Sequence, residues 1–412
     1  MADKQIFTVN GRFEAELLLN PRRESDVNRA AALGCYTREQ AEEAISRIAT
    51  WPDYAETSLR TLSGAAAELG IGRLWCKDEG RRLGLASFKA LGAVYASVSE
   101  VSNLLAKRLG RQVSDIDLLS GKFSEELKEN FLICCTDGNH GFSVANAARR
   151  MGCRAVIYIP SGVSEGREEA LRREGAEVVR INGIYDEAYA AVEEVAKAEP
   201  GAILISDSAT PYYQDIPIRC MTGYSVMARE ILAQLEDELP THLMLPAGCG
   251  GMAAAMMTAF YHLLGDRVPR FIIVEPLTAD CVFASGLAGE PTVVEGDLET
   301  IMGGLSCAAV SHVAWPTISA GASAFLRMND NAAVEAMRLF ASPRSGDPRI
   351  VAGETGAAGL GGLLALCEDP AARALIDLDE NAKVLVINCE GATDPVAFRQ
   401  LTGQSPETPV AA

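Results

Sequence analysis

Lys89 stands where a lysine is costly unless it has a chemical role. It follows the aromatic Phe88 and opens an apolar helical run that continues to Val98. Burial disfavours the charged form of lysine and lowers its pKa, which makes the amine a nucleophile. A desolvated lysine of this kind suits an enzyme that forms a Schiff base, and a solvated lysine on the first turn of an amphipathic helix is the structural alternative. This stretch alone does not separate the two.

The hexapeptide Thr136-Asp137-Gly138-Asn139-His140-Gly141 stands directly after a predicted strand and directly before a predicted helix. Ligands of open parallel sheets bind at the carboxyl ends of strands, and the free N–H groups of a helix N-terminus attract anions. The glycines allow a ligand to approach the backbone closely. Asp137 could act there as an acid or a base, or it could serve only to cap the turn.

A second strand-to-helix turn, Ala247-Gly248-Cys249-Gly250-Gly251-Met252, has three glycines in four residues. Such a turn can form a nest of backbone N–H groups for a phosphate. The sequence lacks the Lys and Ser/Thr of a nucleoside-triphosphate loop, and it lacks a complete dinucleotide fingerprint with its acidic residue. A nucleotide-binding protein is therefore a poor alternative, and a tight turn without a ligand is the structural one.

Three weaker signals fall at strand ends or at the start of a helix: Asn388-Cys389-Glu390-Gly391, Ser206-Asp207-Ser208 and Gly353-Glu354-Thr355-Gly356. Each is ambiguous alone. Taken together, the motifs supply a phosphate nest, carboxylates at strand ends and a candidate nucleophilic lysine. A small phosphorylated aldehyde cofactor needs these parts, which indicates pyridoxal phosphate.

The elements that must position these residues read as alternating strands and helices. Continuous apolar strands are predicted at 131–135, 155–159, 177–181 and 202–205, and again at 242–246, 271–274 and 384–388. Such strands, separated by helices, indicate βαβ units and buried parallel sheets. We expect an α/β fold with two open, twisted parallel-sheet lobes. The predicted large domain comprises 1–95 plus 223–412, and the predicted small domain is 96–222.

The less regular segments give weaker predictions. Residues 1–35 read as a partly extended arm, and 276–312 as loop-rich. One long helix is expected within 216–235, and another over 316–327.

Composition narrows the class of protein. The 412 residues have a net charge of −18, which argues against nucleic acid and anionic membranes as partners. No apolar run is long enough for a membrane span, and the N-terminus lacks a signal-peptide core, so we expect a cytoplasmic protein. The eleven Cys read as buried thiols, with a Cys281–Cys307 pair left open, and neither Cys nor the four His show the spacing of a metal site.

The Phe-Lys and Asp-Gly-Asn-His motifs resemble those of fold type II pyridoxal-phosphate enzymes. Within that group the chain is most similar to the diaminopropionate ammonia-lyases, over roughly residues 50–400. Further matching segments are Lys77-Asp78-Glu79, Asp207-Ser208, 216–224, 300–305 and Glu390-Gly391. The resemblance implies that pyridoxal phosphate lies between the two lobes, that a small amino acid is the substrate, and that the protein is a homodimer.

The resemblance also implies roles for individual residues. Lys89 would hold the cofactor covalently and take the Cα proton, and Asp137 and Asp207 would be the acidic catalytic residues. The remaining cofactor contacts would be Phe88, Asn139, Gly248, Cys249, Gly250, Gly251, Met252 and Cys389. The substrate would contact Thr136, Asp137, Gly138 and His140.

Three positions depart from the dehydratase relatives: Leu91 replaces an Arg, Asp137 replaces a Ser, and Cys389 replaces the usual Ser or Thr near the pyridine nitrogen. The first two argue against plain threonine deamination. We therefore expect α,β-elimination of D- and L-2,3-diaminopropionate to pyruvate and two ammonia. A dehydratase of serine, threonine or 3-hydroxyaspartate and a β-replacement synthase are the alternatives.

Overall fold

The computed structural model describes residues 5–22, 34–136, 138–183, 185–344 and 346–407. The chain divides into two compact units: unit 1 comprises Met1–Arg38, Glu56–Arg81 and Met227–Ala412, and unit 2 comprises Glu39–Ala55 and Arg82–Val226. This division differs from the predicted boundaries (1–95 plus 223–412, and 96–222) in two main respects: residues 39–55 belong to unit 2, and unit 2 resumes at Arg82 and so contains the whole helix that Lys89 opens. That helix, α4 (Lys89–Leu109), packs against α7 (Asn139–Met151) and α10 (Asp215–Gly223).

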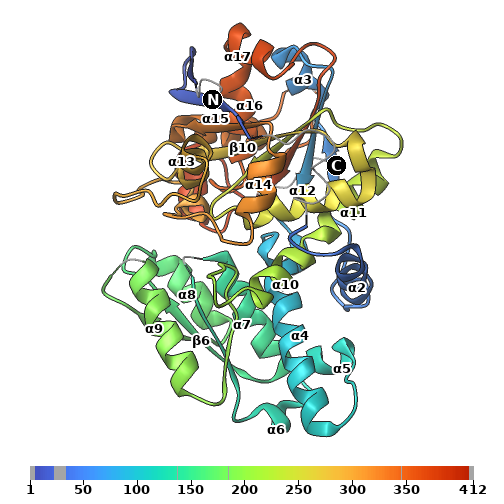
Figure 1. Ribbon diagram of the computed structural model, residues 1–412, viewed down its shortest axis with the longest axis vertical. Coiled ribbons are helices and arrows are strands. Elements are labelled where there is room, and N and C mark those ends of the chain that lie inside the picture. The colour runs from blue at the N-terminus through green and yellow to red at the C-terminus, as the bar shows by residue number, and fades with distance from the viewer. Residues whose placement is uncertain (1–4, 23–33, 137, 184, 345, 408–412) are drawn as a thin grey trace. The chain divides into compact units, whose positions relative to one another are not determined.

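Unit 2 is built on a four-stranded sheet in the order β7-β6-β5-β8, and all of its strand pairs are parallel. The strands are β5 (Phe131–Cys135), β6 (Arg154–Ile159), β7 (Glu177–Arg180) and β8 (Ala202–Leu204). Its other helices are α2 (Arg38–Ile48), α5 (Asp115–Leu119), α6 (Ser124–Leu127), α8 (Glu165–Arg173) and α9 (Tyr185–Ala198) (Figure 1). The regular βα alternation of the sequence thus produces this unit.

Unit 1 contains an eight-stranded sheet in the order β1-β2-β11-β10-β9-β12-β4-β3. The five central strands, from β11 to β4, run parallel, and the outer strands pair antiparallel. The strands are β1 (Ile6–Val9), β2 (Ala15–Leu19), β3 (Leu59–Thr61), β4 (Arg73–Asp78), β9 (His242–Pro246), β10 (Arg270–Pro276), β11 (Ala324–Met328) and β12 (Lys383–Asn388). A sheet of this type presents its ligand-binding edge at the carboxyl ends of the parallel strands.

The helices of unit 1 are α3 (Ser63–Leu69), α11 (Ser225–Leu235), α12 (Gly251–Leu264), α13 (Cys281–Ala288), α14 (Trp315–Gly321), α15 (Asp330–Ala341), α16 (Ala358–Cys367), α17 (Pro370–Leu375) and α18 (Pro395–Thr402). α16 is apolar on all sides, buried along nearly its whole length, and packs on the parallel strands (Figure 1). A helix without a polar face must be buried in this way. No helix in the described part of the chain is long and apolar enough to cross a membrane.

Several sequence predictions were wrong in detail. The N-terminal arm contains the hairpin β1–β2, whose second strand pairs with β11. The helix predicted over 316–327 ends at Gly321, and its second half is the strand β11. The loop-rich stretch 276–312 contains α13, and the long helix within 216–235 is two helices, α10 and α11, separated at Tyr224. The β2–β11 pair joins segments about 300 residues apart, so local periodicity could not reveal it.

Candidate functional site

The loop ahead of Lys89 has a backbone conformation that residues with side chains rarely adopt. Leu83 and Ala86 have φ values of 50° and 56°. Such conformations cost about 1–3 kcal/mol and cluster at functional sites. The fully buried side chain of Arg82 donates from Nη1 to the carbonyl oxygen of Ala55 at 3.2 Å. The loop is thus held in one shape up to the point where Lys89 opens α4.

Two glycines let α4 and α10 approach each other closely beside Lys89. A Cβ on Gly92 would lie 2.6 Å from a backbone oxygen of α10, and a Cβ on Gly223 would lie 2.6 Å from a backbone oxygen of α4. Neither position accepts a larger residue unless the backbone moves. The ring of Tyr224 then lies 4.8 Å from the ring of Phe88. These contacts hold the first turn of α4, from which Lys89 projects.

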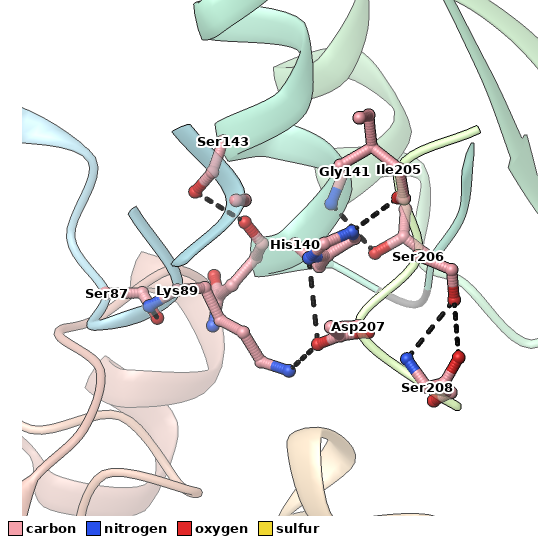
Figure 2. A network of polar contacts seen from close by, with 12 residues as sticks. Ser87, Lys89, His140, Gly141, Ser143, Ile205, Ser206, Asp207 and Ser208 are labelled. Carbon is pink, nitrogen blue, oxygen red and sulfur yellow. Dashed lines mark hydrogen bonds and ion pairs between the residues drawn. The ribbon is translucent and has the colours of Figure 1, made fainter. Parts of the chain in front are cut away.

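Lys89 and His140 are directed at one carboxylate, that of Asp207 (Figure 2). Nζ of Lys89 donates to Oδ2 of Asp207, and Nδ1 of His140 lies 3.6 Å from the same oxygen. Nε2 of His140 lies 2.8 Å from the carbonyl oxygen of Ile205. Lys89 comes from α4, His140 from α7 and Asp207 from the segment after β8, so three separate elements of unit 2 bring these side chains together.

The Asp207 carboxyl group is ionised at neutral pH. Burial alone would raise its pKa, but the electrostatic effects of His140 and Lys89 and the hydrogen bond from Lys89 hold that pKa below the usual range. A carboxylate in this state accepts hydrogen bonds and balances positive charge, and it is a poor proton donor. The geometry therefore makes Asp207 the ionic partner of the lysine amine rather than a general acid.

The loop that begins at Thr136 supports itself. Thr136 Oγ1 accepts hydrogen bonds from the backbone N–H groups of Gly138 at 3.0 Å and Gly141 at 3.1 Å. A Cβ on Gly141 would lie 2.3 Å from Cγ2 of Thr136, so this position requires glycine. Asn139 opens α7, as the position of the motif predicts. Asp137, predicted to be an acidic catalytic residue and a substrate contact, lies outside the described residues.

In unit 1 the turn ahead of α12 has glycines with positive φ where the sequence predicts a phosphate nest. Gly248 and Gly250 have φ values of 55° and 87°, and helix α12 begins at Gly251. A Cβ on Gly250 would lie 2.7 Å from Cδ1 of Ile318, and a Cβ on Gly248 would lie 2.9 Å from the carbonyl oxygen of Gly304. The turn therefore leaves little room for side chains at two positions and places the N-terminus of α12 directly after β9, although the N–H of Gly250 itself donates to the carbonyl oxygen of Ala247 at 2.9 Å. This is the arrangement that a phosphate requires.

The residues after β12 are linked by hydrogen bonds to Thr355, and through Thr355 to Gly304 beside the same turn. Thr355 Oγ1 accepts from the backbone N–H of Gly304 at 3.1 Å, and the Thr355 N–H donates to Oε1 of Glu390 at 3.1 Å. The buried Cys389 thiol donates to the carbonyl oxygen of Thr355 at 3.5 Å. Thr355 thus connects the end of β12 to Gly304, whose carbonyl oxygen lies beside Gly248 of the glycine-rich turn.

The cysteines show no disulfide among the described residues. All eleven are free thiols, Cys281 and Cys307 included. Burial raises the pKa of Cys281 far above that of an exposed thiol. The described part of the chain contains no cluster of three or more His, Cys, Asp or Glu side chains that could hold a metal ion.

Three contributions to the site were missed at the sequence level. These are the left-handed residues Leu83 and Ala86, the connecting residue Thr355, and the pairing of His140 with Asp207. Thr355 lies in a motif that was noted as ambiguous, so a signal existed for it. The backbone of Leu83 and Ala86 has no signal, because neither residue type favours a positive φ.

Comparison with known proteins identifies the family. The family model described as "Pyridoxal-phosphate dependent enzyme" matches residues 50–390. A diaminopropionate ammonia-lyase from Salmonella typhimurium is 36% identical over 385 residues, which cover 90% of this chain and 94% of the relative. The crystal structure of holo diaminopropionate ammonia lyase from Escherichia coli is 31% identical, covers 97% of this chain and 98% of its own, and has a TM-score of 0.83.

A more distant structure extends the likeness of the fold alone. Threonine deaminase isoform 2 from Solanum lycopersicum is 20% identical, with a TM-score of 0.70 over 97% of this chain. The sheets described above agree with the fold type II architecture that the sequence predicted. The matches over most of the chain are decisive for its classification. The chain belongs to the pyridoxal-phosphate-dependent enzymes, in the family of the diaminopropionate ammonia-lyases.

Proposed function

We propose that this protein is a pyridoxal-phosphate-dependent ammonia-lyase that converts 2,3-diaminopropionate to pyruvate and two ammonia. The observation that supports this most directly is the 36% identity, over 90% of the chain, to a diaminopropionate ammonia-lyase. The residues fit the cofactor: the Gly248–Gly250 turn is a cradle that a Cβ would fill, and Lys89 is an amine held by a carboxylate. Bound pyridoxal phosphate would supply the sink for the negative charge that develops at Cα.

The proposal divides the work among the chain's own residues. Lys89 holds the cofactor and receives the Cα proton on Nζ. Gly248, Cys249, Gly251 and Met252 would hold the phosphate through backbone N–H groups, and Gly250, whose N–H donates to the carbonyl oxygen of Ala247 at 2.9 Å, would give the turn its shape. Asn139 would donate to the ring oxygen of the cofactor, Phe88 would line its site, and Cys389 would lie beside the pyridine nitrogen. Thr136, Gly138 and His140 help to shape the substrate site.

Asp207 takes a narrower role in this proposal than its acidic type suggests. Because Asp207 is ionised, it orients the Lys89 amine and keeps it charged until the cofactor binds. The leaving amine must be protonated as it departs, which requires a different donor. A homodimer and a cytoplasmic location are also part of the proposal, and the dimer is tested by light scattering of the purified chain.

We further propose that Asp137 and Lys89 act as bases toward opposite configurations at Cα, so that both isomers of the substrate react. Asp137→Asn should then abolish turnover of the D-isomer much more than turnover of the L-isomer. The L-isomer rate of the same variant is the internal control for folding and cofactor loading. Equal losses on both isomers would contradict the two-base assignment.

The test of the reaction itself is a substrate panel. The chain loaded with pyridoxal phosphate is given D- and L-2,3-diaminopropionate, L-serine, L-threonine and 3-hydroxyaspartate, and keto acid and ammonia are followed. Two ammonia per pyruvate from diaminopropionate is the expected result. Turnover of the hydroxy amino acids alone would replace the proposal by a dehydratase.

A further inference from the structure

His140 is a buried histidine whose two ring nitrogens have different surroundings. Nε2 lies 2.8 Å from the carbonyl oxygen of Ile205, and because a carbonyl oxygen only accepts, Nε2 bears a hydrogen. Nδ1 is buried without a hydrogen-bond partner among the described residues. It faces Oδ2 of Asp207 at 3.6 Å, slightly beyond hydrogen-bond distance (Figure 2). The backbone thus fixes the tautomer and leaves Nδ1 as the position that can gain or lose a proton.

The charges around this position come from few groups. Oδ2 of Asp207 accepts from Lys89 and faces His140, so one oxygen meets two groups that can be cationic. Three other titratable groups, on neighbouring elements of unit 2, interact electrostatically with Asp207. Burial raises the pKa of all three groups, and it raises the pKa of Tyr189 to about 12. These groups are Cys134 of β5, Tyr189 of α9 and Cys220 of α10. They are neutral at neutral pH, so among the described residues the charge balance involves Lys89, Asp207 and His140.

We infer that His140 is a positioning residue that balances the charge of Asp207: Nδ1 takes up a proton when Lys89 is uncharged and releases it when Lys89 is an ammonium ion. With a charged Lys89, the carboxylate already has its counter-ion. When Lys89 loses that charge, Asp207 would be a buried carboxylate without a cation, which is costly. Protonation of Nδ1 restores an ion pair on the same oxygen.

The transfer needs no outside reactant. An N–H bond breaks at Nζ of Lys89, an N–H bond forms at Nδ1 of His140, and no electrons are exchanged. The proton released by the lysine therefore stays beside the site. The inference rests on the proposed function for the identity of Lys89 as the cofactor lysine, but the coupling between these side chains is measurable without turnover.

The test is a titration of the histidine side chains by NMR. The sequence has four histidines, so ¹³C labelling of their rings gives a short list of resonances, and His140→Gln identifies the resonance of His140. The full chain is titrated from about pH 5 to 9 as wild type, Lys89→Met and Asp207→Asn. Loss of the lysine should raise the pKa of His140 by about one unit or more, and loss of the carboxylate should lower it.

His242 of unit 1 is the internal control. Its Nδ1 lies 2.7 Å from Oγ1 of Thr241 and its Nε2 lies 2.8 Å from the carbonyl oxygen of Ile376, so neither variant should move it. If the pKa of His140 is the same in both variants as in the wild type, and the resonances of His242 are also unchanged, the inference is overturned.

If Lys89→Met does not fold, Lys89→Gln tests the same coupling. If the pKa of His140 responds to these variants but the wild type does not turn over diaminopropionate, the inference stands and the proposed function is rejected. If the wild type turns over diaminopropionate but the pKa of His140 does not respond, the proposed function stands and the inference is rejected.

Discussion

Replacing Lys77 by methionine is expected to lower the free energy of unfolding by about 3–5 kcal/mol. The side chains of Lys77 and Glu230 are 0% and 2% exposed, and Nζ lies 2.6 Å from Oε2. Nζ also donates to the carbonyl oxygen of Thr57 at 2.8 Å. The substitution removes a buried cation from beside the Glu230 carboxylate and removes a donor to the buried carbonyl oxygen of Thr57. The Lys77-Asp78-Glu79 segment that suggested the family thus contains, at its first residue, half of a buried ion pair.

The double variant Lys77→Met/Glu230→Met separates the pair from its surroundings. Each single change should cost about 3–5 kcal/mol, so independent sites would sum to about 6–10 kcal/mol. The double variant removes both charges and loses mainly the hydrogen bonds that these two side chains make with Thr57, at a cost of about 1–3 kcal/mol. The double variant should therefore be more stable than either single one.

Urea unfolding followed by tryptophan fluorescence measures these values. Trp75 and Trp315 lie in unit 1 with the ion pair, and Trp51→Phe removes the signal of unit 2. Lys383→Met is the matched control in the same unit, because the side chains of Lys383 and its partner Glu238 are 36% and 40% exposed and breaking this pair should cost at most about 1 kcal/mol. Additive losses in the double variant, or a loss below about 1 kcal/mol for Lys77→Met, would refute the reasoning.

Three further predictions concern the site and its support. Gly250→Ala should weaken binding of pyridoxal phosphate at least about tenfold, because its Cβ would lie 2.7 Å from Cδ1 of Ile318. Gly403→Ala is the control for backbone strain, because Gly403 also has a positive φ (71°) but has open space around its Cβ position. Ala86→Gly should raise the free energy of unfolding by about 1 kcal/mol in urea melts, since glycine adopts a φ of 56° without strain, and a loss of stability would contradict the strained-loop reading. Burial raises the pKa of Glu275 to about 8, from about 4.5 in the unfolded chain. Between pH 4.5 and 8 the folded protein therefore holds a proton that the unfolded chain has lost. The free energy of unfolding should fall as the pH rises through this range, by up to about 1.4 kcal/mol per pH unit. Glu275→Gln should remove this pH dependence, which urea unfolding at several pH values from 5 to 8 would measure. The same pH dependence in Glu275→Gln and in the wild type would contradict the prediction.

The parts of the fold that the sequence predicted are those with local signals. Strands such as Phe131–Cys135 and His242–Pro246 are continuous apolar runs flanked by helices, and both appear where expected. β11 did not follow its local pattern, because its five residues form a strand only through pairing with β2 and β10. Tertiary pairing decided that segment, as it often does for short strands.

The site divides in the same way. The nest at Gly248–Gly250 could be predicted because glycine spacing is itself the physical requirement for a positive φ. The convergence of Lys89, His140 and Asp207 could not, because these residues are 118 positions apart at the extremes and no periodicity connects them. His140 was assigned to the substrate from its motif, and only its ring contacts reveal the pairing with Asp207.

Two separate physical devices act on Lys89, and they should fail in different ways. Its position is set by shape: the close contact of α4 with α10 at Gly92 and Gly223 leaves no room for a Cβ. Its charge is set by Asp207 and, through that carboxylate, by His140. A substitution at either glycine must displace a helix and therefore disturb packing at every pH. A substitution at His140 leaves the helices in place and changes the proton balance, so its effect must depend on pH.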